Sequence, residues 1–468
     1  MNKLFFLILA FTVPFFTQAQ EALDLRKCID IAQKNNLQLK VQTINERRAR
    51  IEEKLARTSR LPNLNMNASL GRNFGFAIDP TTNTFSNVST DFFNSGLNAN
   101  ARLFRFGQIN NDIRNAELGR ESARQDLIQM EREIALQVSN AFLQIALQQE
   151  LLNNAKRNLD ITQQQLERTQ KLYESGAAAE ADQLNLEAQL ASDQQTVVEA
   201  QNAYDLSILN LRQLMLYEGE LQLQLPETEG RIADEYATMK VEAISDRATA
   251  WDARIKSAEL RADAQSFSLQ ATEKERLPSL DLFGNANTRY SSNFRTSDGI
   301  QLVETSAQVN IDGEPAIITQ ETFQPVFKDA TFSEQLNNNL GQALGLSLNI
   351  PIYNRNQLSA AIEQEELTLE QRKIELEQAT QQVELEVAQA WQDYKAGKSR
   401  FDAAQTSLRA RELTEKNARR ALELGAMNAF DYTQNRLLLD NAISNFLQAK
   451  YNYLFSIKVL DYYTGKPL

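Results

Sequence analysis

The sequence predicts a mixed α and β fold, in which long antiparallel helices accompany two pairs of strands in an internally duplicated chain. Two tracts of about 65 residues each are rich in helix-forming residues and contain no proline. Four shorter runs alternate polar and apolar residues with a period of two, which is typical of strands. The same order of helix, strand, strand, long helix and returning helix occurs twice along the chain.

The N-terminal segment "MNKLFFLILAFTVPFFTQAQ" has the pattern of a secretory signal peptide. Lys3 precedes a short apolar run, and Thr17 and Ala19 occupy the small-residue positions before a cleavage site, so residues 1–19 are the predicted signal peptide. No later run of about 18 apolar residues predicts a transmembrane helix. Cys28 follows "LRK", which is not the context of an acylated cysteine. An exported chain of this kind reaches the periplasm, or the outer membrane as part of a β-barrel.

Composition restricts the classes of function. The net charge of −12 and the pI near 4.9 argue against a nucleic-acid-binding surface. The 468 residues include no histidine, which removes histidine-based catalytic triads and most zinc sites. The lone Cys28 has no partner, and most carboxylates have the spacing of solvated helix faces. We therefore expect no catalytic residues, no metal site and no cofactor.

The duplication is visible at two offsets. "RLPNLNMNASLGRNF" begins at Arg60 and "RLPSLDLFGNANTRY" begins at Arg276, an offset of 216 residues. Further along, the offset is 249 and stays constant through many matched pairs: Gln108 and Gln357, Ile113 and Ile362, Glu117 and Glu366, Ala141 and Ala390, Gly176 and Gly425, Asp182 and Asp431, Tyr204 and Tyr453, Ile208 and Ile457, Leu211 and Leu460.

The change of offset, 249 − 216 = 33 residues, predicts an insertion between the two strands of the second half. It falls within the polar segment "SSNFRTSDGIQLVETSAQVNIDGEPAIITQETFQPVFKDATF", which we expect to be a loop. The predicted domains are therefore a first structural repeat over residues 20–230 and a second over residues 231–468.

Each repeat has the same predicted elements. A helix over about 24–60, with a break at "KNN", corresponds to one over about 244–276. The strands are predicted at about 62–74 and 94–106 in the first repeat and at about 278–290 and 340–353 in the second. The long helices, about 108–175 and 357–424, span on the order of 95 Å each. They end at Gly176 and Gly425, after which returning helices run to about residues 216 and 463.

The strand runs carry two distinct faces. Asparagines alternate with apolar residues in the first strand, and "LGQALGLSLNIPIY" repeats the pattern with glycine and serine, although Phe283 breaks the polar face of the third strand. Runs of about 9 to 13 residues fit transmembrane strands, but a half-buried soluble sheet gives the same alternation. In the membrane interpretation the lipid-facing residues are Leu64, Met66, Ala68, Leu70, Leu346 and Leu348.

The need to close the strands into a barrel distinguishes the membrane interpretation from the soluble one. Four strands cannot form a closed barrel alone, and an open sheet edge in hydrocarbon leaves backbone groups unpaired at a cost of several kcal/mol each. If the strands lie in a membrane, several chains must therefore combine their strands into one barrel.

The chain resembles the TolC-like outer-membrane efflux proteins over essentially its whole predicted mature length. The resemblance rests on the duplicated plan, on "LP.L" at each first strand, on "LFRFGQ" and "IPIYNRNQ" before each long helix, and on "YESGAAAEADQL" and "LELGAMNAFDYTQ" at the turns. It implies a homotrimer, in which each protomer contributes four strands to a twelve-stranded transmembrane β-barrel and its helices to an α-helical barrel that spans the periplasm.

The resemblance also implies a function and partners. The protein would be the outer-membrane exit duct of a tripartite efflux or type I secretion system. It would passively conduct substrate from an inner-membrane transporter, through a periplasmic adaptor (a membrane fusion protein), to the cell exterior. Its partners would be further copies of itself, the adaptor, the transporter and outer-membrane lipid, with no nucleic acid.

In this family the turns at Gly176 and Gly425 correspond to the periplasmic tips where the tunnel closes. Family members carry acidic residues six and nine positions after the second glycine, where this chain has Asp431 and Gln434. Some members have an arginine two positions after that glycine, paired with an acid of the first repeat. Those positions are Met427 and Asp182 here, which implies a thinner acidic ring and no closing ion pair. Helix N-capping remains an alternative role for both aspartates.

A second class of function shares the helical tracts. A periplasmic coiled-coil scaffold or adaptor would have long helices but no channel. An adaptor is expected to carry a compact lipoyl-like or β-barrel module between its helices, which the isolated strand pairs do not resemble. Conductance across a planar bilayer distinguishes the two classes.

Overall fold

The computed structural model describes residues 22–78, 85–87, 89–219, 221–225, 234–311 and 313–468. The predicted signal peptide and the predicted boundary between residues 230 and 231 lie outside the described residues. The chain forms two structural units, which are described separately. Of the described residues, the first unit comprises those within Ile51–Glu117 and Asp263–Leu369. The second unit comprises those up to Arg50 together with those within Leu118–Ala262 and Glu370–Leu468.

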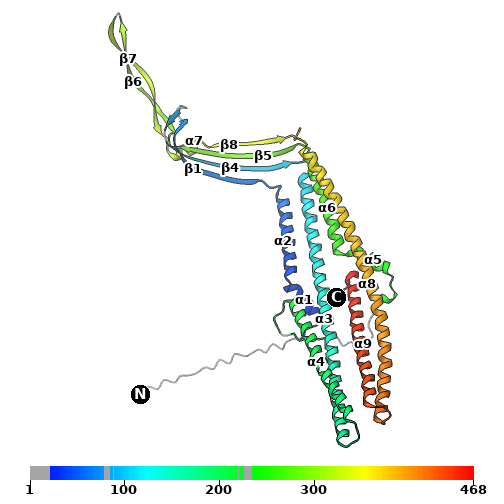
Figure 1. Cartoon of the computed structure of the whole chain (residues 1–468). Helices are drawn as coiled ribbons and strands as arrows, with labels where there is room; N and C mark the ends of the chain where they lie inside the picture. Colours follow the sequence, from blue (N-terminus) through cyan, green and yellow to red (C-terminus); the bar gives the residue numbers. More distant parts are fainter. Residues whose placement is uncertain (1–21, 79–84, 88, 220, 226–233, 312) are drawn as a thin grey trace, which may run out of the picture. The chain divides into compact units, whose positions relative to one another are not determined.

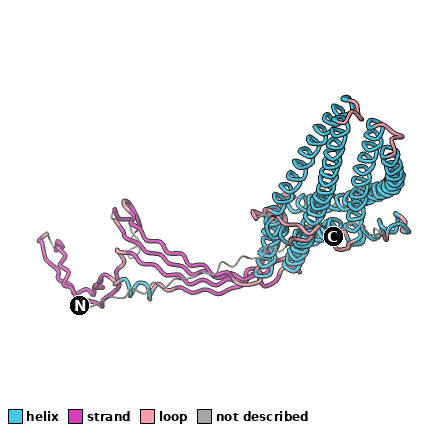
Figure 2. Tube along the Cα trace, turned by 90° about the horizontal axis from the view of Figure 1, so that it is seen from below, coloured by secondary structure: helices cyan, strands magenta, loops and turns pink. Residues whose placement is uncertain are grey.

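The first unit contains a four-stranded antiparallel sheet in the order β1-β4-β5-β8 (Figures 1 and 2). Its strands are β1 (Asn63–Asn73), β4 (Thr90–Phe104), β5 (Ser279–Ser291) and β8 (Gly341–Asn349). The central pair, β4 and β5, joins the two repeats, while β1 and β8 form the edges of the sheet. A small hairpin of β2 (Phe76–Ile78) and β3 (Phe85–Asn87) lies in the connection between β1 and β4.

The register places the predicted faces on opposite sides of this sheet. Residues directly opposite in an antiparallel pair share a face, so Met66 opposite Leu97 and Leu282 opposite Leu346 belong to one apolar face. Asparagines pair on the other face, where Asn98 Nδ2 donates to Asn67 Oδ1 at 3.1 Å. The predicted lipid-facing residues all lie on the apolar face: Leu64, Met66, Ala68, Leu70, Leu346 and Leu348.

Two aromatic side chains on the polar face lie over glycines of the neighbouring strand. A Cβ atom added at Gly345 would be 2.6 Å from Phe283 Cζ, and one added at Gly71 would be 2.7 Å from Phe92 Cζ. Phe283, which breaks the polar pattern in the sequence, therefore covers backbone at a position where no side chain competes for the space.

The predicted loop of the insertion is wrong for most of its length. Residues 295–329 form a long two-stranded hairpin of β6 (Arg295–Ile311) and β7 (Glu314–Asp329), followed by the short helix α7 (Phe332–Asn338). Both faces of the hairpin are largely exposed, so neither face needs to be uniformly apolar. The sequence therefore lacks the regular alternation of polar and apolar residues that predicts a strand. Thr331 and Glu334 form a capping box that begins α7.

The second unit consists mainly of helices. In the first repeat these are α1 (Leu25–Asn35), α2 (Leu37–Thr58), α3 (Gln108–Glu174) and α4 (Glu180–Met215). In the second repeat they are η1 (Tyr236–Thr238), α5 (Val241–Trp251), α6 (Ala253–Lys274), α8 (Gln357–Glu423) and α9 (Ala429–Thr464). Helices α2, α3, α6 and α8 contribute residues to both units. The break predicted at "KNN" is confirmed by Asn36, whose side chain accepts from Gln38 N at the start of α2.

The cores of the two repeats follow the constant offset of the sequence. Ile134, Val138 and Leu211 are buried in the first repeat, and Val383, Val387 and Leu460 are buried in the second, each pair 249 residues apart. The packing supplies a physical reason for the repeat, because the same helical face is buried twice. No helix of the described residues is both long and apolar enough to cross a membrane.

Asp234, just after the undescribed segment between the repeats, is held by a polar cluster. Its carboxylate accepts from Tyr394 OH at 2.7 Å and from Tyr453 OH at 2.6 Å, and Lys398 Nζ lies 3.5 Å away. Tyr236 also donates to Asp461 at 2.8 Å. These contacts attach the start of the second repeat to α8 and α9.

Candidate functional site at the helix tips

Two matched turns join the long helices to the returning helices. Gly176 and Gly425 both have φ of 75°, a left-handed conformation that favours glycine. At each turn the residue after the glycine donates back to the helix, from Ala177 N to Leu172 O at 2.7 Å and from Ala426 N to Ala421 O at 2.8 Å. This arrangement is the Schellman motif, and it ends α3 and α8 in the same way.

Neither predicted gate aspartate is an N-cap residue. The N-cap of α9 is Asn428, whose Oδ1 accepts from Asp431 N at 2.8 Å, while its Nδ2 donates to Asp431 Oδ2 at 3.0 Å. The N-cap of α4 is Ala179, which has no capping side chain. Asp182 and Asp431 instead occupy the third helical position, where the helix dipole favours a negative charge.

The structure brings some of the predicted tip residues together and separates others. Asp182 and Gln434 line a common cavity of about 240 Å³. Asp431 and Met427 do not line that cavity, and Asp431 is exposed. The acid of the first repeat therefore approaches the second repeat at Gln434.

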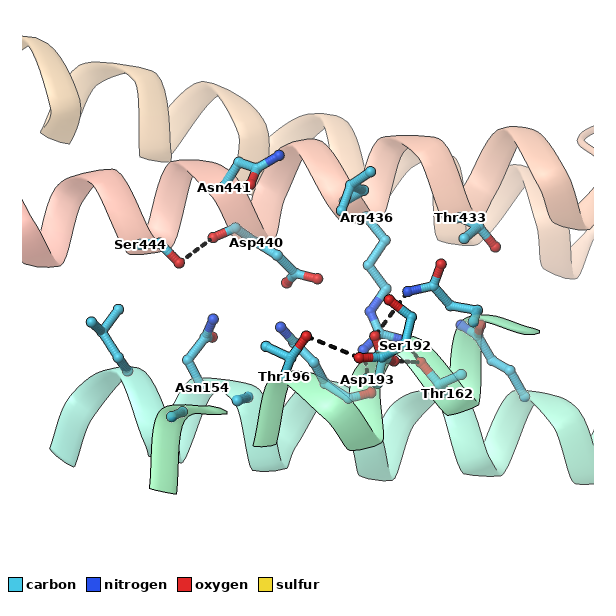
Figure 3. A pocket seen from close by; sticks show the side chains of 17 residues that line it. Asn154, Thr162, Ser192, Asp193, Thr196, Thr433, Arg436, Asp440, Asn441 and Ser444 are labelled. Carbon is cyan, nitrogen blue, oxygen red and sulfur yellow. Dashed lines mark hydrogen bonds between the residues drawn. The ribbon is translucent and has the colours of Figure 1, made fainter. Parts of the chain in front are cut away.

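A buried polar network that the sequence did not predict joins the second repeat to the first. Arg436 of α9 is only 7% exposed, and its guanidinium donates to Asn158 O at 2.6 Å and to Thr162 Oγ1 at 3.2 Å on α3. Thr162 in turn donates to Asp193 on α4. Figure 3 shows Arg436, Thr162 and Asp193 among the side chains that line a cavity, whose volume is about 290 Å³. One arginine thus connects three helices.

Asp440, one turn after Arg436 on α9, lines the same cavity. Burial raises the pKa of its carboxyl from 3.8 to about 6, and the nearby Arg436 only partly offsets that effect. Asp193 and Glu415 contribute negative charge that raises it further. The network therefore contains a carboxyl group whose pKa lies well above that of an exposed aspartate.

A second link holds α9 against its own partner helix. Tyr432 OH donates to Glu415 on α8 at 2.9 Å, and burial, followed by this bond, raises the pKa of Tyr432 to about 12. Both residues line a cavity of about 720 Å³ between the four long helices, together with Arg157 and Arg168.

The sequence held only a weak signal for this network. Arg436 and Asp440 have the spacing of an ordinary solvated helix pair. A better signal is that neither residue is repeated in the first half of the chain. At the offset of 249, Arg436 corresponds to Glu187 and Asp440 corresponds to Ala191. A buried interaction made between the repeats need not be duplicated within each of them.

The long paired helices, their matched turns and the four-stranded sheet define a class of internally duplicated α and β proteins. The chain belongs to the outer membrane efflux protein family, whose model matches residues 28–215 and 244–466. It is a family of channel proteins and not of enzymes, and this membership makes the chain an exit duct of the outer membrane. The scaffold alternative is thereby set aside. No curated protein matches the chain.

Solved structures share the fold at low sequence identity. A structure of CusC, reported with conformational changes that accompany folding and transmembrane channel formation, is 19% identical with a TM-score of 0.74, covering 95% of this chain and 92% of that one. VceC from Vibrio cholerae is 15% identical, with a TM-score of 0.70 and coverage of 94% and 96%. The open state of the MtrE outer membrane channel from Neisseria gonorrhoeae is 17% identical, with a TM-score of 0.72 and coverage of 94% and 89%.

Proposed function

We propose that the chain acts as a homotrimer, the exit duct of a tripartite efflux or type I secretion system. An inner-membrane transporter would deliver substrate through a periplasmic adaptor, and the duct would conduct it passively to the cell exterior. The observation that carries this proposal is the sheet itself, which has one apolar face and one asparagine-rich face. Its edge strands, β1 and β8, each have one side that is unpaired within the described residues.

The edges favour closure by identical copies. Because every neighbouring pair in the order β1-β4-β5-β8 is antiparallel, β1 and β8 run in opposite directions. The β8 edge of one copy can therefore pair antiparallel with the β1 edge of the next. Three copies would give twelve strands without an open edge, which removes the unpaired backbone groups that a membrane does not tolerate.

The apolar face would then contact lipid. Met66 is 74% exposed, Leu70 is 80% exposed and Leu346 is 61% exposed in the single chain, which is costly in water and favourable in hydrocarbon. Leu64, Ala68 and Leu348 share this face. The asparagine-rich face would line the water-filled lumen.

We further propose that the gate lies at the tips. Three copies of Asp431 and of Asp182 would place negative charge around a narrow entrance, with Gln434 in place of a second acidic ring. Met427 cannot make the ion pair that an arginine would make there. The Arg436 network, which lies within one chain, is the link that would hold the second-repeat tip in its closed position.

Site-directed labelling tests the facing of the strands. In a Cys28→Ser background, single cysteines replace Met66 or Asn67 in the full chain, and a polarity-sensitive thiol label is quenched either by a lipid-soluble or by a water-soluble agent. We expect lipid-soluble quenching at position 66 and aqueous quenching at position 67. Equal quenching at both positions would contradict the proposal, as would a detergent-solubilised particle with a mass other than three chains.

A further inference from the structure

A groove of about 900 Å³ lies on the polar face of the sheet. It lies at the strand ends that the chain connects directly to helices, such as the start of β1 after α2 and the end of β4 before α3. The end of α2 and all four long strands contribute to its lining, so it is built within one chain. Four of the lining residues carry charge or an aromatic ring: Arg102, Arg105, Asp281 and Phe283.

The positive groups of this groove are incompletely paired. The side chain of Arg102 is exposed and makes no hydrogen bond or salt bridge within the part of the chain that the structure describes. Arg105 has a single loose ion pair, from its Nη2 to Asp281 Oδ1 at 3.6 Å, and its Nε is buried without a partner. The lining thus holds two guanidinium groups but only one carboxylate, which pairs loosely with Arg105 alone.

A second carboxyl group lies near the arginines without lining the groove. Asp112 of α3 interacts electrostatically with Arg102 and Arg105, but burial is the larger effect and raises the pKa of Asp112. The carboxyl is therefore less readily ionised than an exposed aspartate, which limits how far it compensates the guanidinium charge.

The rest of the polar face is nearly free of charge. Of the strand residues on this face that the structure describes, only Arg102, Asp281 and Arg289 are charged, and Arg289 lies at the opposite end of β5. Asparagine, serine and glycine make up most of the remainder. On this face, the positive groups that could bind an anion are consequently concentrated at the groove.

Phe283 adds an apolar contact beside the arginines. Its ring lies over Gly345 of the neighbouring strand, which fixes it against the sheet. Guanidinium groups bind carboxylates and sulfonates through charge-assisted hydrogen bonds, and an aromatic ring binds a flat apolar group by stacking. The combination suits a molecule with an anionic head and an aromatic body.

We propose that this groove is a cargo-binding site for aromatic organic anions. The inference rests on the proposed function, because it takes the polar face as the wall of the duct. In a threefold assembly the site would occur three times, which gives a belt of six arginines around the lumen.

The test uses 1-naphthalenesulfonate as the probe and the full chain in planar bilayers. We expect the probe to block the current through the wild-type channel, and Arg102→Gln combined with Arg105→Gln to weaken the block by about tenfold or more. Arg289→Gln is the matched control on the same face and should leave the block within about twofold. Phe283→Leu should weaken block by the aromatic anion and leave the response to sulfate unchanged.

Equilibrium binding of the probe to the detergent-solubilised chain, measured by calorimetry, provides a second readout that does not require conduction. Binding should be lost in the Arg102→Gln, Arg105→Gln variant and retained in an Arg102→Lys, Arg105→Lys variant, which keeps the charge. Unchanged block and binding in the glutamine variant, or an equal loss in Arg289→Gln, would overturn the site. Probe binding by a chain that conducts no current would contradict the duct and leave the site standing.

Discussion

Arg436 donates a hydrogen bond to the backbone carbonyl of Asn158 at 2.6 Å, across the two halves of a duplicated chain. The bond joins α9, which follows the second tip, to α3, which precedes the first. Since Arg436 is buried, its guanidinium can replace these partners with water only if the helices separate. A movement of the second tip away from the first repeat must therefore break this bond.

Replacing Arg436 by glutamine should loosen the tip. The variant leaves Asn158 O and Thr162 Oγ1 without the hydrogen bonds that Arg436 donates, which typically costs about 2–4 kcal/mol in a buried network. We expect faster amide hydrogen exchange in the second half of α3 and the first half of α9, and a larger single-channel conductance. Arg419→Gln is the control, because Arg419 makes only an exposed i,i+4 pair with Glu415. Unchanged exchange in Arg436→Gln would show that the bond does not hold the tip.

The tip should be more stable in mild acid than at neutral pH. Burial raises the folded-state pKa of Asp440 to about 6 from 3.8, so the folded tip binds this proton more tightly than the unfolded chain. The stabilising contribution is complete below about pH 4 and is lost as the pH rises through about 6. Arg436 of α9, Asp193 of α4 and Glu415 of α8 are the charged groups that act on it.

Asp440→Asn tests this pH dependence, because asparagine keeps the shape and removes the proton equilibrium. We expect the variant to unfold with less pH dependence between 4 and 7, and to be more stable at pH 7.5 by on the order of 2 kcal/mol. Hydrogen exchange at the tip is the measurement. If Asp440→Asn showed the same pH dependence of hydrogen exchange as the wild type, another titrating group would have to be responsible for it.

Asp431 should contribute to cation binding at the proposed entrance. Asp431→Ala removes an exposed carboxylate whose three copies would face one another, so block by a trivalent cation such as hexaamminecobalt should weaken by several-fold. The helix should lose only about 0.5 kcal/mol, since Asn428 and not Asp431 is the N-cap residue. Asp182→Asn is the comparison at the matched position. Unchanged cation block in Asp431→Ala would leave this residue a purely local role at the helix end.

Asp234 should stabilise the attachment of the second repeat. Burial alone would raise its pKa, but hydrogen bonds from Tyr453 and Tyr394 and the charge of Lys398 hold the pKa below 3.8. Its stabilising contribution is therefore present above about pH 4 and is lost as the pH falls through the lower, folded-state pKa. Asp234→Asn should destabilise the protein by about 1–3 kcal/mol in urea unfolding at pH 7. Asp246→Asn on α5, where Asp246 makes no side-chain bond in the described structure, should be nearly neutral.

The sequence predicted those features that repeat with a regular period. The predicted mixed α and β fold class is confirmed. It was predictable because the residues of β1 and β8 alternate between two faces of the sheet, and because the offset of 249 reflects two equivalent cores. The β6–β7 hairpin was mistaken for a loop, since both of its faces are largely exposed and carry no simple alternation. Arg436 was missed because its partners, Asn158 and Thr162, lie more than 270 positions away and only the folded chain brings them together.

Single-channel recording of the purified mature chain in a planar lipid bilayer is the most direct test of whether the protein is a duct. We predict discrete openings from a detergent-stable trimer, with a conductance that rises in Arg436→Gln and falls when trivalent cations are added on the tip side. A folded, membrane-inserted protein that carries no current under any of these conditions would contradict the assignment of the chain as an outer-membrane duct.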